Sequence, residues 1–181
     1  EVLTVSYTCF DLDVQDHVAH LRFSRPEAFN SMNREFWSEF PAAVNELDAS
    51  GEARALVISS SGKHFCSGMD LSVFTSGGGG SSEATGGHAR GATRTHVLQL
   101  QETMNCLERA RMPVLAAIQG GCIGGGVDLI AACDSRYASA DAFFCIQEIN
   151  IAITADVGTL QRLPHLIPSG MMRELAYTGR R

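Results

Sequence analysis

Alternating and continuous runs of apolar residues predict several short strands. Residues 18–23 (Val-Ala-His-Leu-Arg-Phe) alternate apolar and polar side chains, which predicts a half-buried strand ended by the following Ser-Arg-Pro. Residues 55–59 and 113–118 are apolar without alternation, which is typical of strands covered on both faces. Further short strands are expected at 135–138 and 142–146.

Helical spacing of apolar residues predicts helices between these strands. Residues 36–47 carry apolar side chains three or four apart, after Ser31 or Asn33 as N-cap. Pro41 lies inside this stretch and predicts a kink or a break. A second helix is expected over about 93–111.

The order of elements predicts an α/β domain. Strand, helix, strand, loop, helix and strand follow one another, as in folds whose parallel strands are joined by crossover helices. The Gly- and Ser-rich segment 76–91 is interpreted as a flexible loop within one domain rather than as a linker between two. A further helical stretch begins at Leu160, and the length of 181 residues fits one domain with a sizeable core.

Composition and charge exclude several classes of partner. The net charge of −6 gives no electrostatic reason to expect nucleic acid or an anionic membrane, and no stretch is long and apolar enough for membrane insertion. The six cysteines occur singly, which indicates buried thiols in a reducing compartment. No metal-binding spacing is found among the histidines. The chain begins at Glu1 and ends at Arg181 without terminal signals, so both ends are expected to be trimmed.

Two glycine-rich turns are candidates for binding an anion. Residues 120–126 match neither a dinucleotide fingerprint nor a P-loop, so a phosphate cradle is not expected. Three glycines at a helix start leave free N–H groups at the positive end of the helix dipole, which suits an oxyanion hole, although close packing alone would also explain them. The second turn, 64–71, follows the strand at 55–59. Because no Gly-x-Ser-x-Gly elbow is present, Ser67 and Cys66 are not expected to be nucleophiles.

Three acidic residues lie within apolar stretches and are expected to be buried: Asp128, Glu148 and Asp156. A carboxylate in such surroundings either pairs with donors in a structural role or has a raised pKa that suits proton transfer. For any one of them alone, the structural role is the more common outcome. Asp134 is assigned to that structural role.

Together these motifs resemble the crotonase superfamily, the enoyl-CoA hydratase/isomerase fold, across nearly the whole chain. The resemblance rests on Arg25-Pro26, Asn30-Ser31-Met32-Asn33, Phe65 to Leu71, Gly120 to Asp134, Phe143-Phe144 with Gln147-Glu148, and Gln161-Arg162-Leu163-Pro164. It implies an α/β fold of the crotonase type, a spiral of ββα repeats. It also implies that residues 1–181 form the core domain, truncated at the C-terminus, with the family's C-terminal helices absent from this chain.

The resemblance also implies a thioester site. In the family two backbone N–H groups hold the thioester carbonyl, and the matching positions here are Met69 and Gly125. The implied substrate-binding residues are Ser67, Gly68, Met69, Asp70, Leu71 and Gly125. The two glycine turns would then form one oxyanion hole.

The acidic residues resemble those of one branch of the superfamily. Hydratases carry Glu at the positions of Asp128 and Glu148 and a small residue at that of Asp156, whereas the present set looks like the dienoyl-CoA isomerases, which shift a 3,5-diene to a 2,4-diene. By this resemblance Glu148 is the base at the α-carbon. Asp156 is assigned to reprotonation at the ε-carbon and Asp128 to polar support, two roles that could be exchanged.

The implied activity belongs to fatty acid β-oxidation. It needs no metal and no cofactor beyond the coenzyme A of an acyl-CoA substrate, and the family's assemblies imply a homotrimer or a dimer of trimers. An enoyl-CoA hydratase or monoene isomerase and a non-catalytic acyl-CoA-binding protein are the alternatives. Cytoplasm, mitochondrial matrix and peroxisomal matrix all fit the cysteine usage.

Overall fold

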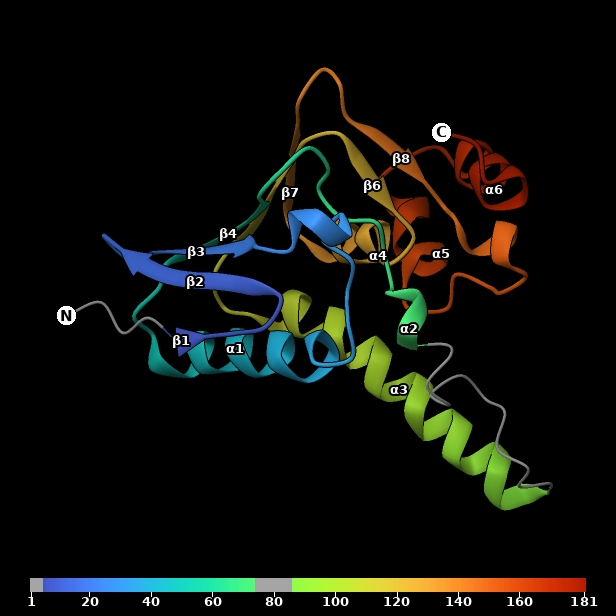
Figure 1. Cartoon of the computed structure of the whole chain (residues 1–181), viewed down its shortest axis with the longest axis horizontal. Helices are drawn as coiled ribbons and strands as arrows, with labels where there is room; N and C mark the ends of the chain where they lie inside the picture. Colours follow the sequence, from blue (N-terminus) through green and yellow to red (C-terminus); the bar gives the residue numbers. More distant parts are fainter. Residues whose placement is uncertain (1–4, 74–85) are drawn as a thin grey trace.

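The longer strands form one sheet, in the order β1-β2-β3-β4-β5-β7 (Figure 1). The computed structural model describes residues 5–73 and 86–181. The strands of this main sheet are Val5–Ser6 (β1), Phe10–Gln15 (β2), Val18–Phe23 (β3), Ala55–Ser60 (β4), Val114–Ile118 (β5) and Ser135–Ala138 (β7). A second, two-stranded parallel sheet pairs β6 (Gly121–Ile123) with β8 (Phe143–Cys145).

Crossover helices connect the parallel part of the main sheet. β3, β4, β5 and β7 pair in parallel, whereas β1 and β2 are antiparallel to their neighbours. α1 (Phe36–Ser50) joins β3 to β4, α3 (Gly87–Arg109) joins β4 to β5, and α4 (Gly125–Ala132) lies between β5 and β7. This arrangement confirms the α/β class predicted from the order of elements.

The chain repeats one unit: a strand of the main sheet, a short parallel pairing beside it, and a helix. β5, β6 and α4 form one unit, and β7, β8 and α5 (Thr159–Arg162) form the next. The two earlier units use single bridges, in which Met32 pairs with Met69 and Cys66 with Cys122 of β6. The fold is therefore the expected spiral of ββα repeats.

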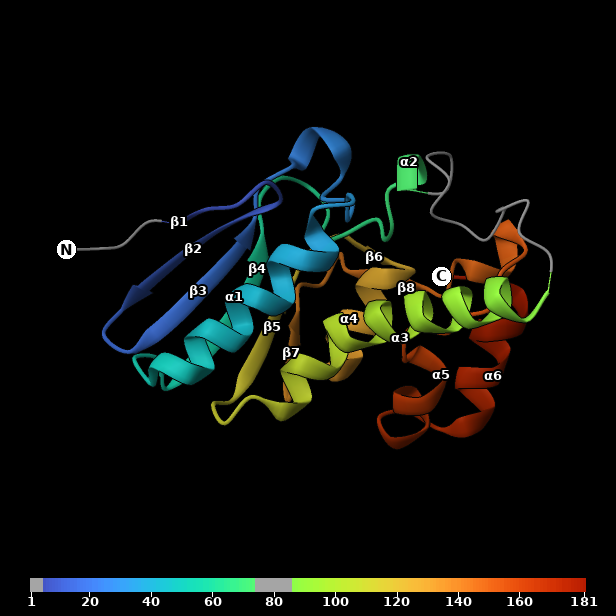
Figure 2. The ribbon, with the colours of Figure 1, turned by 90° about the horizontal axis from the view of Figure 1, so that it is seen from below.

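The helices cover one face of the main sheet. α1 and α3 lie side by side against it, as two perpendicular views show (Figures 1 and 2). Leu56 and Ile58 of β4 are buried on the covered face, whereas Val57 on the other face is only half-buried. The predicted cover on both faces of these strands is therefore incomplete, because α1 and α3 lie on the same side of the sheet and the other face of the described strands is only half-buried. The hydrophobic core contains residues from both described segments.

Helix α1 is continuous through Pro41, so the predicted break is absent. A proline within a helix leaves the carbonyl four residues earlier without its usual donor. Here that carbonyl belongs to Trp37 and accepts a hydrogen bond from the Thr103 hydroxyl of α3 at 3.3 Å. The neighbouring helix thus satisfies the acceptor that the proline frees.

Helices α1 and α3 begin at positions that differ from those expected from the sequence. Glu35, rather than the predicted Ser31 or Asn33, occupies the N-cap position of α1 and makes no side-chain cap. Asn33 nevertheless accepts a hydrogen bond at 3.0 Å from the N–H of Phe36, the first residue of the helix. α3 begins at Gly87, earlier than the expected start near residue 93. A helix that has already nucleated gains one hydrogen bond for each added residue, and so it extends even through a glycine. The remainder of the predicted loop at 76–91, up to residue 85, lies outside the described residues.

Several short elements were not predicted from the sequence. Besides β1, β2 and β6 they are η1 (Pro26–Ala28), α2 (Leu71–Val73), η3 (Glu148–Ile151), η4 (Leu163–His165) and α6 (Ser169–Thr178). All six cysteines are buried free thiols, as expected. In the described part of the chain, no helix combines the length and apolar character that crossing a membrane requires.

Candidate active site

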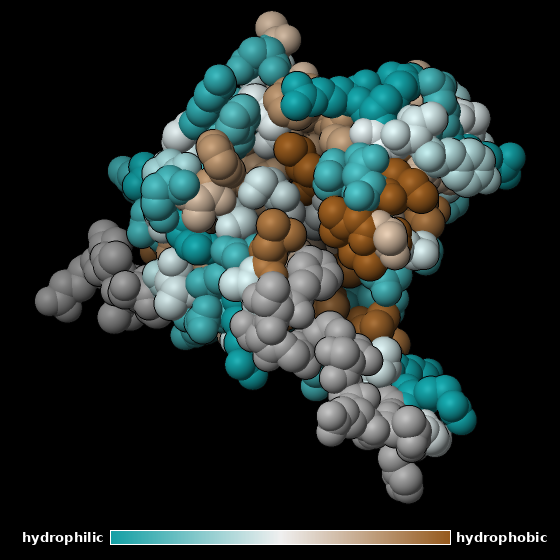
Figure 3. Space-filling model, turned by 45° about the vertical axis from the view of Figure 1, so that its right-hand side comes forward, coloured by the Kyte–Doolittle hydropathy of each residue, from teal (hydrophilic) through white to brown (hydrophobic). Residues whose placement is uncertain are grey.

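A pocket of about 1060 Å³ opens beside the start of α4. Three stretches distant in sequence line it, at 67–71, 123–125 and 147–157, together with one face of α3. Apolar surface gathers around a hollow on the side of the molecule that carries α2, α5 and α6 (Figure 3). All the site residues predicted from the sequence line this pocket: Ser67, Gly68, Met69, Asp70, Leu71, Gly125, Asp128, Glu148 and Asp156.

The two glycine turns come together at this pocket. The N–H of Ile123 donates to the Cys66 carbonyl at 2.9 Å, and the N–H of Cys66 donates to the Gly121 carbonyl at 3.1 Å. The turns approach so closely that a Cβ built on Gly125 would lie 3.7 Å from the Met69 nitrogen. The backbone N–H groups of Met69 and Gly125 therefore stand side by side.

The direction of the Met69 N–H follows from the peptide bond before it. The Gly68 carbonyl accepts a hydrogen bond from the N–H of Met32 at 2.8 Å. In a trans peptide the C=O and N–H point in opposite directions, so the Met69 N–H points away from Met32. Gly68 has φ +88°, and a Cβ there would lie 2.9 Å from the Ile123 carbonyl oxygen, so this turn requires glycine.

The Gly125 N–H belongs to the first residue of α4. The preceding carbonyl, of Gly124, accepts hydrogen bonds from the N–H groups of Val127 and Asp128 inside the helix. The Gly125 N–H therefore points out of the helix, at the positive end of its dipole. Within the described residues neither this N–H nor that of Met69 has an acceptor, so two donors are free for a ligand atom.

Asp128 is almost completely buried, at 1% exposure, on α4. One of its carboxylate oxygens accepts two hydrogen bonds of 2.6 Å, from the N–H and the hydroxyl of Thr159 at the start of α5. Burial raises the pKa of Asp128, and the Thr159 hydrogen bonds partly oppose that rise. The side chain thus caps α5 and also lines the pocket.

Glu148 begins η3, and its Oε2 atom is buried without a hydrogen-bond partner in the described part of the chain. Its other oxygen packs against Gly124, where a Cβ would lie 3.2 Å away. Burial, with smaller contributions from the charges of Asp128 and Asp156, raises the pKa of Glu148 to about 7. A carboxyl group with this pKa is divided between acid and base at neutral pH, which suits proton transfer.

Asp156 lines the pocket but is exposed, so the prediction of a buried side chain is wrong. The apolar residues that suggested burial, Ile151 and Ile153, are themselves 44% and 42% exposed. The backbone carbonyl of Asp156 accepts a hydrogen bond from the Gln101 amide of α3 at 2.7 Å, which fixes this turn. The structure therefore brings three carboxyl groups to one pocket and leaves one of them in contact with solvent.

Cys66 and Asp134, which the sequence also singled out, are not among the residues that line the pocket. Burial raises the pKa of the Cys66 thiol to about 12, so it is protonated and not a nucleophile. The Asp134 carboxylate accepts a hydrogen bond from the Val114 N–H at 2.7 Å, as its assignment to a structural role predicts. Within the described residues no group of three or more His, Cys, Asp or Glu side chains has an arrangement that could hold a metal ion.

Sequence reasoning missed the contribution of α3 and of Thr159 to the site. His96, Val97 and Leu100 line the pocket from α3, and their spacing along one helix face was the available signal. Thr159 gave no such signal, because its partner Asp128 lies 31 residues earlier in the sequence.

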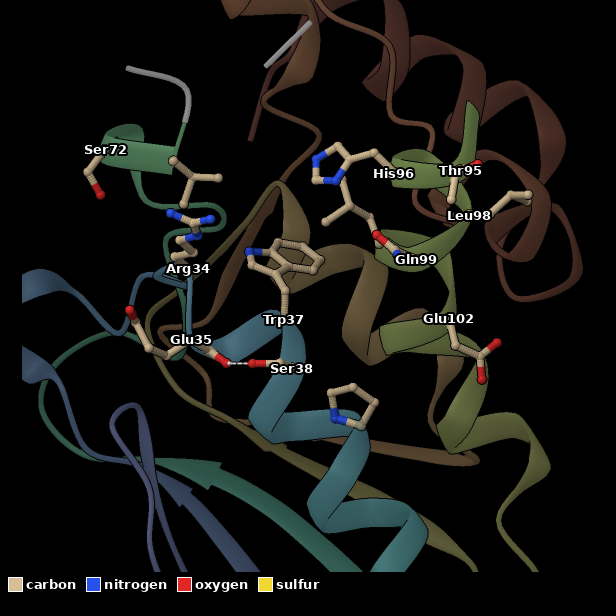
Figure 4. A pocket seen from close by; sticks show the side chains of 13 residues that line it. Arg34, Glu35, Trp37, Ser38, Ser72, Thr95, His96, Leu98, Gln99 and Glu102 are labelled. Carbon is tan, nitrogen blue, oxygen red and sulfur yellow. Dashed lines mark hydrogen bonds between the residues drawn. The ribbon is translucent and has the colours of Figure 1, made fainter. Parts of the chain in front are cut away.

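A second pocket, of about 1160 Å³, lies between the start of α1, α2 and α3 (Figure 4). None of the predicted site residues lines it. Trp37 and His96 contribute to both pockets, and the close-up view shows them on facing elements. The predicted site residues therefore all belong to the first pocket, and Trp37 lies where the two pockets adjoin.

Solved structures of enoyl-CoA hydratases share this fold. A putative enoyl-CoA hydratase from Streptomyces coelicolor A3(2) matches with a TM-score of 0.86 at 24% identity, covering 98% of this chain and 62% of that one. A putative enoyl-CoA hydratase from Thermobifida fusca YX, solved in complex with acetoacetyl-CoA, matches with a TM-score of 0.82 at 29% identity, covering 95% and 67%. The fold is therefore that of the crotonases.

The family model described as enoyl-CoA hydratase/isomerase matches residues 13–181, and the chain belongs to this family. It is 45% identical over 168 residues to the peroxisomal Delta(3,5)-Delta(2,4)-dienoyl-CoA isomerase of Arabidopsis thaliana. It is 43% identical over 168 residues to the mitochondrial Delta(3,5)-Delta(2,4)-dienoyl-CoA isomerase of Homo sapiens. These alignments cover 91% and 92% of the chain but 59% and 51% of the two relatives.

Proposed function

We propose that the protein is an isomerase that converts a 3,5-dienoyl-CoA into the conjugated 2,4-dienoyl-CoA in fatty acid β-oxidation. The observation that carries this proposal is the meeting of two free backbone N–H groups with the buried, unpartnered carboxyl oxygen of Glu148 at one pocket. A second carboxyl group, that of Asp156, lines the same pocket. The similarity to the plant and human dienoyl-CoA isomerases supports the choice of reaction.

In the proposed first step Glu148 removes a proton from the α-carbon. The thioester oxygen accepts hydrogen bonds from the N–H groups of Met69 and Gly125, and these hydrogen bonds strengthen as the dienolate forms. Each such donor contributes about 3 to 4 kcal/mol to lowering the barrier in well-studied oxyanion holes. A pKa of about 7 allows Glu148 to be ionised at neutral pH and still strong enough as a base.

In the proposed second step the dienolate takes a proton at the ε-carbon from Asp156. The double bonds then lie at positions 2 and 4, one proton has left the α-carbon, and one has arrived at the ε-carbon. Glu148 ends protonated and Asp156 ionised, so each turnover requires both groups to exchange protons with water. The solvent exposure of Asp156 suits this exchange. Asp128 acts as polar support through its hydrogen bonds to Thr159.

Partners and location follow from the same proposal. The substrate is an acyl-CoA thioester, as in the related acetoacetyl-CoA complex, and the reaction needs no cofactor beyond that coenzyme A. The buried free thiols suit a reducing compartment, and the mitochondrial and peroxisomal relatives point to one of those matrices. The proposed assembly is a homotrimer or a dimer of trimers, which would cover apolar side chains now exposed, such as Ile149 and Met171.

The direct test mixes the intact protein with a 3,5-dienoyl-CoA and follows ultraviolet absorbance. Appearance of the conjugated 2,4-dienoyl thioester is the expected result. A parallel assay offers a 2-enoyl-CoA and measures hydration. Hydration alone would contradict the proposal and favour the enoyl-CoA hydratase, whereas binding without either reaction would favour an acyl-CoA-binding protein.

Two variants separate the proposed roles. Glu148→Gln should abolish turnover with the fold retained, and Asp156→Asn should slow the appearance of the conjugated product. Asp11→Asn, in an exposed ion pair on the β2–β3 hairpin, is the control for loss of one carboxylate. Substantial activity in Glu148→Gln would exclude Glu148 as the base.

A further inference from the structure

A cluster of polar side chains lies directly beside Met69. Both oxygens of the Asp70 carboxylate are occupied. One accepts hydrogen bonds from the N–H and hydroxyl of Ser72, at 3.0 and 2.8 Å. The other accepts hydrogen bonds from the Ser31 hydroxyl at 2.9 Å and the Arg25 guanidinium at 3.4 Å. Four donors match the number of acceptor sites of a carboxylate, so the cluster fixes the orientation of this side chain.

These partners connect segments far apart in sequence. Arg25 also donates to the backbone carbonyl of Ser31 at 2.7 Å, which ties the cluster to the residue before Met32. The Ser72 and Ser31 hydrogen bonds, with that of Arg25, lower the pKa of Asp70 to about 2. The carboxylate is therefore ionised at every pH at which the protein would be assayed.

The cluster adjoins two backbone hydrogen bonds that hold the residues before and after Met69. The N–H of Met32 donates to the Gly68 carbonyl at 2.8 Å, and the N–H of Asp70 donates to the Met32 carbonyl at 2.9 Å. The first of these hydrogen bonds sets the direction of the Met69 N–H, because both groups belong to one peptide plane. The side-chain cluster fixes the two residues, Ser31 and Asp70, that adjoin this pairing.

We propose that Asp70 is a positioning residue for the oxyanion donor. Its hydrogen bonds to Arg25, Ser31 and Ser72 hold the adjoining backbone, so that the Met69 N–H points toward the thioester oxygen. The inference rests on the proposed function, in which Met69 is an oxyanion donor. Preorganised donors stabilise the transition state effectively because they do not have to reorient during the reaction. A small displacement of a donor therefore lowers the rate of the chemical step strongly. Arg25 also balances the negative charge of Asp70, which stands one residue from the donor.

The test compares Asp70→Asn with Asp11→Asn in the intact protein. Arg22–Asp11 is a matched pair with the same N–O distance of 3.4 Å, but its side chains are 54% and 57% exposed, against 22% each for Arg25–Asp70. The measured quantities are kcat and KM for the 3,5-dienoyl-CoA. A third measurement is the infrared carbonyl stretch of a bound 2-enoyl-CoA labelled with carbon-13 at the thioester carbonyl.

Asp70→Asn should lower kcat by about 10- to 100-fold with KM changed far less, since a displaced donor loses part of the 10²- to 10³-fold effect of a missing one. It should also reduce the shift of the carbonyl stretch that binding causes in the wild type. Asp11→Asn should match the wild type in all three measurements. An unchanged carbonyl stretch in Asp70→Asn would overturn the inference, whether or not kcat falls.

A milder variant keeps the test valid if Asp70→Asn does not fold. Ser31→Ala removes one of the four donors and leaves the carboxylate, so it should give a smaller loss of kcat and a smaller change of the carbonyl stretch. If Ser31→Ala shows the wild-type kcat and the wild-type carbonyl stretch, the inference is overturned. A wild-type protein that polarises the bound carbonyl but does not isomerise the diene would contradict the proposed function alone. A wild-type protein that does not polarise the carbonyl would contradict both.

Discussion

Replacing Glu148 by Gln should change how the stability of the protein depends on pH. In the unfolded chain this carboxyl loses its proton near pH 4.5, whereas in the native state it holds the proton until about pH 7. Between these values the native state binds more protons than the unfolded state, so the free energy of unfolding falls as the pH rises. The stabilising contribution is complete below pH 4.5 and is lost by the time the pH has risen through about 7.

The magnitude follows from the separation of the two pKa values. At 1.36 kcal/mol for each pKa unit, the separation corresponds to an upper limit of about 3 kcal/mol, which solvent screening at this partly buried site reduces. Gln has the same shape and does not ionise. The stability of Glu148→Gln relative to the wild type should therefore increase by up to about 3 kcal/mol between pH 4.5 and pH 8.

Urea unfolding at several pH values measures this difference. The chain has a single tryptophan, Trp37, so its fluorescence reports on the boundary between the two pockets, and circular dichroism provides a second probe. Glu52→Gln, at an exposed position outside the pocket, controls for the loss of one negative charge. Parallel pH profiles for the wild type and Glu148→Gln would refute the assignment of a raised pKa to this residue.

Three further substitutions test other parts of the structure. Gly68→Ala should reduce kcat by about 10²- to 10³-fold, because the added Cβ would displace the turn that presents the Met69 donor. The control is Gly51→Ala, which should leave kcat unchanged, because Gly51 has a similar positive φ but open space around it. Thr159→Val should destabilise the protein by about 1 to 3 kcal/mol in urea unfolding, since it removes a hydroxyl donor from a buried carboxylate. Thr103→Val should lower the free energy of unfolding by about 1 kcal/mol in the same measurement, because the Trp37 carbonyl, which Pro41 leaves without a helical donor, loses its hydrogen bond. An unchanged free energy of unfolding would contradict this role of Thr103.

The elements that sequence patterns predicted are those in which local periodicity and burial agree. β3 buries Ala19, Leu21 and Phe23 on one face, as its alternation predicts. The apolar runs that became β4 and β5 were also recognisable, although their second faces are only half-buried. The start of α3 could not be recognised from the sequence, because a glycine-rich segment favours a loop unless an adjoining helix extends through it.

Long-range partners explain what the sequence did not reveal about the site. Asp156 follows an apolar run in which Ile151 and Ile153 lie on the surface although Ala155 is buried. An apolar run alone does not distinguish a core segment from an exposed one. Asp70 lines the pocket as predicted, but its hydrogen bonds to Ser31 and Arg25, which precede it by 39 and 45 residues, could not be foreseen from the sequence. The meeting of the two glycine turns was expected only through the resemblance to a known family, since nothing local to either turn indicates the other.

In the proposed reaction Glu148 removes one proton from the α-carbon of a dienoyl thioester, and Asp156 supplies a different proton to the ε-carbon. The most direct measurement reacts a 3,5-dienoyl-CoA with the intact protein in deuterium oxide and locates deuterium in the product by nuclear magnetic resonance. The product should be a 2,4-dienoyl-CoA with deuterium at the ε-carbon, because Asp156 exchanges its proton with solvent before it donates. Recovery of unreacted substrate, or of a hydrated 3-hydroxyacyl-CoA in place of the conjugated diene, would contradict it.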